Sequence, residues 1–137
     1  MQKNKLILAV VVLISSFAVT ACGIEKLNDK KIADTDFTVV SNAEMPKEVL
    51  RIVEERKENP FKVTYSDEQY TYIIVGYGKQ QYHGYSIRVN EVYETKNAIC
   101  VRTEFEGPKE YRNNQEVSYP YIVIKIKVTD KNVVFHE

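Results

Sequence analysis

A period-two alternation of apolar and polar side chains, which begins near Phe61 and continues to the C-terminal end, constrains the fold more than any other feature. Successive side chains of a β-strand point to opposite faces, and this stretch is rich in tyrosine and β-branched residues. Short turn-rich segments separate the runs, which favours antiparallel pairing, because parallel strands would need crossover helices that the sequence does not supply. The pattern predicts strands at 61–66, 69–75, 85–93, 99–105, 119–128 and 133–135.

The residues before these strands predict one helix. Pro46 is tolerated at the start of a helix, and the apolar residues from Val49 to Val53 then recur at helical spacing until Asn59-Pro60 ends the pattern. We expect the apolar stripe of helix 46–58 to pack on the domain's own sheet, and the short run 37–40 to add an edge strand. The expected fold is mainly β (α+β), an antiparallel sheet or sandwich with one packed N-terminal amphipathic helix.

The pattern also predicts how buried the side chains are at two places in the strands, at Ile124-Lys125 and at Cys100. Ile124 lies on the apolar face of the late strand, whereas Lys125 lies on its wetter face. Cys100 lies in an apolar strand and is expected to be a small half-buried side chain, since no cluster of positive charge is near in sequence to lower its pKa.

The N-terminal segment has the order of a lipoprotein signal peptide. Lys3 and Lys5 precede an apolar run at 6–19, and small residues then lead into Cys22. Alkylation of the Cys22 thiol by a diacylglyceryl group, followed by cleavage, would make this residue an acylated (palmitate-bearing) N-terminus. A secretory signal with a chance cysteine and an uncleaved anchor are the alternatives. We therefore expect a cell-membrane protein, lipid-anchored and facing the extracytoplasmic side.

These boundaries divide the chain into a signal peptide at 1–21, a polar tether at 22–35 and a β domain at 36–137. Without Lys3 and Lys5, the chain keeps 17 basic residues against 19 acidic ones. This balance provides no polybasic face for nucleic acid, so membrane association should come from the acyl group. With Cys22 lipidated, Cys100 has no cysteine partner for an intramolecular disulfide.

Signatures of catalysis are sparse. The sequence has no His-Glu-x-x-His, Cys-x-x-Cys, Gly-x-Ser-x-Gly or phosphate-binding glycine motif. The two histidines lack supporting metal-ligand spacing, and the acidic residues are expected to be solvated. We therefore predict a protein that is not an enzyme, with no catalytic residues, cofactor or metal; a hydrolase that uses clustered carboxylates is a distant alternative.

The segment 65–93 holds seven of the ten tyrosines, concentrated around a loop at 76–84 that contains three glycines. Tyrosine combines an apolar body with a hydroxyl group and serves protein interfaces well. The tyrosines could equally pack across strands while the glycines make the turn. The candidate partner-binding residues are Tyr77, Tyr82, His83, Gly84 and Tyr85.

The chain resembles the PrcB family of bacterial lipoproteins, named after a subunit of a surface protease complex. The matching pieces are Gly76-Tyr77-Gly78-Lys79-Gln80, Gly84-Tyr85-Ser86-Ile87, Gly107-Pro108 and Ser118-Tyr119-Pro120-Tyr121. The resemblance covers about residues 36–136, although Tyr82-His83-Gly84 stands where Thr-Gly-Gly is more usual. It implies a noncatalytic accessory or assembly role.

Two functional hypotheses follow. The first is a membrane-anchored, noncatalytic subunit that binds a protein partner, such as a surface protease. The alternative is a protease inhibitor that presents the Gly76–Gly84 loop. Deletion of the loop should distinguish them. Loss of protease inhibition would support the inhibitor, whereas a fall in the amount of the partner protein would support the assembly factor.

Overall fold

A computed structural model of the chain describes residues 30–110 and 116–137. Residues Lys31–Glu137 form one compact unit. The expected signal peptide and its Cys22 lie outside the described residues.

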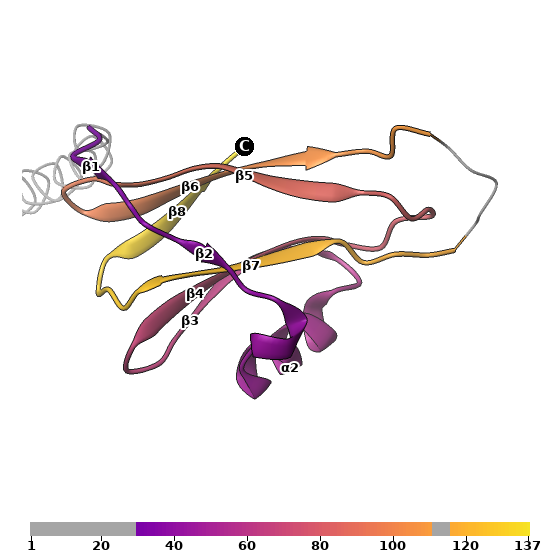
Figure 1. Cartoon of the computed structure of the whole chain (residues 1–137), viewed down its shortest axis with the longest axis horizontal. Helices are drawn as coiled ribbons and strands as arrows, with labels where there is room; N and C mark the ends of the chain where they lie inside the picture. The colour runs from indigo at the N-terminus through magenta and orange to yellow at the C-terminus, as the bar shows by residue number, and fades with distance from the viewer. Residues whose placement is uncertain (1–29, 111–115) are drawn as a thin grey trace, which may run out of the picture. The chain divides into compact units, whose positions relative to one another are not determined.

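Two four-stranded sheets form this unit (Figure 1). The first sheet has the order β1-β5-β6-β8, with bounds Ala33–Asp34, Ser86–Glu94, Ala98–Glu106 and Asn132–His136. The second sheet has the order β2-β7-β4-β3, with bounds Thr38–Val39, Tyr121–Lys127, Tyr70–Tyr77 and Pro60–Ser66. All six strands predicted from the alternation are therefore present, together with the predicted edge strand β2.

The mainly antiparallel pairing that we expected is confirmed, and one pair departs from it, because β6 and β8 run parallel. The chain leaves β6 in the first sheet, forms β7 in the second sheet and returns to β8 in the first. The connection between the two parallel strands therefore passes through a strand of the opposite sheet, whereas we expected that such a connection would need a helix. Every other pair of neighbouring strands is antiparallel.

Strand β4 is buried on both of its faces. Ile73 belongs to the core between the two sheets, whereas its neighbour Ile74 belongs to the core beneath the helix. This position explains why its sequence is continuously apolar from Ile73 to Val75 instead of alternating. Both cores therefore meet at β4, and also at its neighbour β7, which places Val123 in the core beneath the helix and Ile124 in the core between the sheets.

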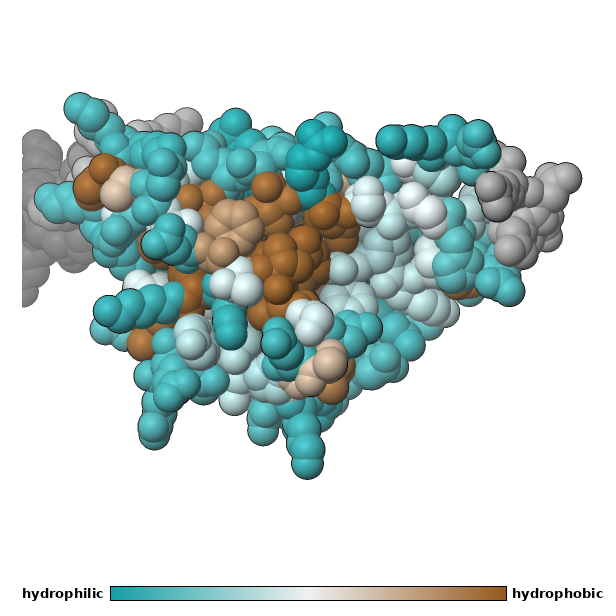
Figure 2. Space-filling view, in the orientation of Figure 1, coloured by the Kyte–Doolittle hydropathy of each residue, from teal (hydrophilic) through white to brown (hydrophobic). Residues whose placement is uncertain are grey.

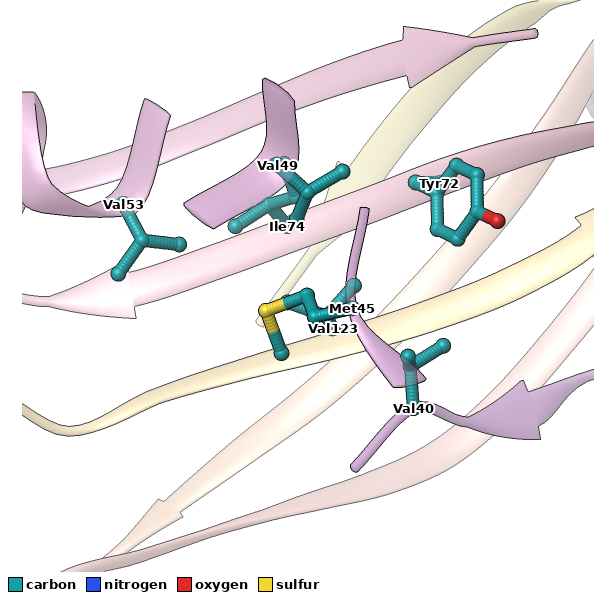
Figure 3. Packing of buried hydrophobic residues seen from close by; sticks show 7 residues of the cluster. All are labelled: Val40, Met45, Val49, Val53, Tyr72, Ile74 and Val123. Carbon is teal, nitrogen blue, oxygen red and sulfur yellow. The ribbon is translucent and has the colours of Figure 1, made fainter. Parts of the chain in front are cut away.

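The predicted helix is confirmed as α2, Lys47–Arg56, which follows the short 3₁₀ helix η2, Asn42–Glu44. Pro46 is its N-cap residue and has an extended backbone. Val49 and Val53 are buried against the outer face of the second sheet, as expected for the apolar stripe (Figure 3). The cluster in Figure 3 consists of Val40, Met45, Val49, Val53, Tyr72, Ile74 and Val123.

The first described residues connect the two sheets. Ala33 and Asp34 pair with Glu94 and Tyr93 of β5, so β1 lies within the range that we expected to be a tether. The chain then crosses to the second sheet, where Val39 pairs with Ile124. The part of the chain that makes sheet contacts therefore begins before residue 36.

Cys100 is more buried than expected, with only 1% of its surface exposed. It is a free cysteine in β6, opposite Tyr93 of β5 in the sheet register. A hydrogen bond to Cys100 raises the pKa of the Tyr93 hydroxyl, with burial as the second cause. The expected role of Cys100 as a small packed side chain is consistent with this position.

Ile124→Asp should destabilise the fold by roughly 4 kcal/mol or more, because it places an unpaired carboxylate in the core between the sheets. Ile124 is 2% exposed. Lys125→Asp should lose only about 1–2 kcal/mol, since Lys125 is half-buried with its Nζ over the Tyr70 ring. Urea titration of the two variants measures both losses, and equal losses would contradict the assignment of faces.

Candidate functional site

The candidate site is at the end of the sandwich where the β4–β5 and β6–β7 connections lie together (Figure 1). The first connection contains the predicted loop, and the second contains Gly107-Pro108 and Ser118. An isolated antiparallel bridge joins Gln80 to Ser118. The motif pieces that are far apart in the sequence therefore meet at this end.

Three aromatic rings form a stack that links the two sheets at the base of the loop. Phe105 of β6 stacks on Tyr77 of β4, with 4.2 Å between ring centroids and 8° between planes. It also stacks on Tyr85, with a centroid distance of 5.1 Å and an interplanar angle of 5°. Such contacts add about 0.5–1.5 kcal/mol per pair beyond the apolar area that they bury. The stack thus fixes both ends of the loop.

A hydroxyl contact supplements the stack. The Tyr77 hydroxyl lies 3.1 Å from Oγ1 of Thr103, which is itself buried in β6. Tyr77 is therefore joined to the first sheet by its ring and by its hydroxyl. Of the two roles considered for the tyrosines, an interface role and a packing role, we assign the packing role to Tyr77.

Backbone hydrogen bonds hold the loop itself. The amide of Gln80 donates to the carbonyl of Ser118 over 2.8 Å, and the amide of Ser118 donates back over 3.0 Å. The Ser118 hydroxyl donates to the carbonyl of Tyr82 at 2.6 Å. These bonds connect the loop to the segment that precedes β7, so the loop backbone has a defined conformation.

Two glycines of the loop have positive φ angles, +75° at Gly78 and +99° at Gly84. A Cβ atom at Gly84 would lie 2.9 Å from Cβ of Pro108, and one at Gly78 would lie 2.9 Å from Pro60. These positions combine a backbone conformation that favours glycine with a close approach. Both glycines are needed for the shape of the loop.

The five predicted site residues are brought to one end of the sandwich, but they differ in exposure. Tyr77 and Tyr85 are half-buried in the aromatic stack, and Tyr82 is also half-buried. His83 and Gly84 are exposed, and Nε2 of His83 lies 3.3 Å from a carboxylate oxygen of Glu116. The tip that is accessible to a partner is therefore centred on His83.

Sequence reasoning missed two residues that build the site. Phe105 was recognised only as the end of a strand, although it is the central ring of the stack. Ser118 was noted only as part of a motif, although it makes three hydrogen bonds to the loop. The hydrophobic pattern contained no signal for either role, because both depend on contacts between distant segments.

The residues after Ser118 lead from the loop towards α2. Lys57 places Nζ 4.9 Å from the ring centroid of Tyr119, and its hydrogen bond to Glu54 raises the pKa of the Lys57 ammonium group. Burial raises the pKa of the Tyr121 hydroxyl, which donates to Oδ1 of Asn42 at 3.0 Å. The loop is therefore continuous with a surface formed by aromatic side chains.

Residues 30–110 and 116–137 contain no group of three or more His, Cys, Asp or Glu side chains that could hold a metal ion. No helix within these same ranges combines the length and apolar character needed to cross a membrane.

Fold and site together define a two-sheet β domain that holds a structured loop at one end. The family described as PrcB C-terminal matches residues 71–127, from β4 through β7. This segment, which contains the loop and the aromatic stack, is therefore similar to the PrcB family. No curated protein and no solved structure matches the chain.

Gly84→Ala should destabilise the protein by about 1–3 kcal/mol, because the new Cβ meets Pro108 and the backbone has a positive φ. Gly107→Ala is the matched control, since its Cβ would lie 3.9 Å from the Tyr85 ring with no positive φ. The control should change stability by no more than about 0.5 kcal/mol. Thermal unfolding compares the two variants, and a Gly84→Ala protein as stable as the control would contradict the loop geometry.

Proposed function

We propose that this protein is a membrane-anchored, extracytoplasmic lipoprotein that acts as a noncatalytic protein-binding or assembly subunit of a surface protease complex. The observation that carries the proposal is a loop held in one conformation by the aromatic stack and by the Gln80–Ser118 bridge, with His83 exposed at its tip. Association is favoured when a binding loop is ordered beforehand, because less conformational entropy is lost.

The chemistry of the tip suits a protein partner. His83 can donate and accept hydrogen bonds, and the half-buried Tyr82 adjoins it in the chain. Aromatic side chains are enriched at the centres of protein interfaces and often dominate their binding energy. The aromatic residues Tyr119 and Tyr121 extend this surface beyond the loop.

The family supports a protease as the partner. The PrcB family, which the sequence resembles and to which residues 71–127 are similar, takes its name from a subunit of a protease complex. The anchor is proposed from the sequence alone, from the apolar run at 6–19 and the small residues before Cys22.

A protease inhibitor that presents the Gly76–Gly84 loop is the second candidate. The fixed loop backbone favours it, because the partners in protease–inhibitor complexes change shape little on binding. Both candidates use the same loop, so the effect on the protease distinguishes them.

Affinity capture of the full chain from its own membranes tests the proposal. His83→Ala should weaken capture of the partner roughly tenfold or more, while it barely changes the thermal midpoint. His136→Ala in β8 is the control and should capture the partner normally. If the unchanged chain, His83→Ala and His136→Ala capture the partner equally well, the interface lies elsewhere. If the unchanged chain captures no partner, the proposed function is contradicted.

The same membranes can report the anchor and the mode of action. Cys22→Ala should lose metabolic fatty-acid label, and equal label on the variant would rule out Cys22 as the acyl site.

Deletion of residues 79–83 should reduce the abundance of the partner protease if the protein is an assembly subunit. An increase in protease activity at constant abundance would favour the inhibitor.

A further inference from the structure

Strand β7 is covered along only part of its outer edge. Thr38 and Val39 of β2 pair with Lys125 and Ile124, and the amide of Val40 donates to the carbonyl of Val123. The chain then turns into η2 at Asn42 and no longer follows β7. Among the described strands, none continues this pairing towards the N-terminal end of β7.

The uncovered edge presents main-chain groups of Tyr121. The amide of Tyr77 donates to the carbonyl of Pro120 over 3.0 Å, so Pro120 points towards β4. Backbone groups alternate between the two edges of an antiparallel strand, and Val123 bonds to β2. The N–H and C=O of Tyr121 therefore point to the side on which β2 has ended.

A groove of about 300 Å³ lies along this edge. Its lining has no charged side chain and consists of Val39, Val40, Asn42, Met45, Tyr119, Pro120, Tyr121, Ile122 and Val123. Figure 2 shows hydrophobic side chains gathered near the centre of the face that Figure 1 presents. Val39, which lines the groove, is one of the exposed large hydrophobic residues. Val39 is 55% exposed.

The opposite edge of the second sheet, β3, carries features that discourage the addition of a further strand. Strand β3 begins with Pro60 and contains Lys62, which pairs with Glu137. Charges, prolines and bulges at edges oppose strand addition. The segment from Tyr121 to Val123 contains none of them.

We propose that this groove, named here the β7-edge groove, binds an extended segment of a protein partner as an added strand antiparallel to β7. The segment would continue the line of β2, exchange hydrogen bonds with the main chain of Tyr121 and direct uncharged apolar side chains into the groove. The groove begins next to Ser118, which bonds to the loop, so the two surfaces are continuous. The inference rests on the proposed function, because it assigns the mode of recognition to the same partner-binding end.

A phage-displayed library of decapeptides, selected on the full chain in detergent, tests the proposal. Val39→Lys introduces an edge lysine into the groove, and Val134→Lys makes the same change at a valine of β8 that is 40% exposed. Selected peptides should bind Val39→Lys roughly tenfold or more weakly than the unchanged chain, while binding to Val134→Lys stays normal. Peptide binding should also slow hydrogen exchange at the Tyr121 amide.

Three results would overturn the proposal: selection of no peptide, equal binding to Val39→Lys, or an unchanged Tyr121 amide. Sedimentation would also overturn it if it showed a dimer that Val39→Lys abolishes, because a second copy would then occupy the edge. The His83 capture experiment separates the two proposals. Partner capture without peptide binding contradicts only the groove, whereas peptide binding without any captured partner contradicts only the proposed function.

Discussion

The burial of β4 on both faces is the constraint on which the rest of the structure depends. Its alternate residues supply the core between the sheets, through Ile73, and the core beneath α2, through Ile74. Because β4 also lies between β3 and β7, its main chain is paired on both edges. A polar residue at either position would be buried without a partner, which costs several kcal/mol in an apolar surrounding. The two layers that flank this strand are therefore fixed by the same few side chains.

The position of the loop follows from this strand. Tyr77 is the last residue of β4, and its ring and hydroxyl reach Phe105 and Thr103 in the opposite sheet. The chain leaves the core at a defined point, passes through Gly78 and returns at Tyr85, the third ring of the stack. The site is thus an extension of the core, and the exposed tip at His83 is carried by residues that are themselves packed. This arrangement fixes the shape of the loop in advance, so the association proposed for it would cost little conformational entropy.

Local patterns predicted most of the elements, and nonlocal contacts account for what they missed. The period-two alternation located the strands and the helical spacing of apolar residues located the helix, because each period reports which face is buried. It could not reveal that β6 and β8 are parallel neighbours, since that pairing depends on the path of β7 through the other sheet. The same limit applies to the site, because tyrosine suits a core and an interface equally well. Only the stacking of Tyr77 on Phe105 shows that Tyr77 is a packed residue and not part of the exposed tip.

The central claim is that the loop is ordered before any partner binds, and hydrogen exchange at the amides of Gln80 and Ser118 tests it most directly. Each of these amides donates to the other residue's carbonyl. In the free protein, both should exchange far more slowly than amides of an unstructured peptide, because exchange then requires the loop to open. Exchange of both amides at the rate of an unstructured peptide would show that the loop is not held, and would contradict the account.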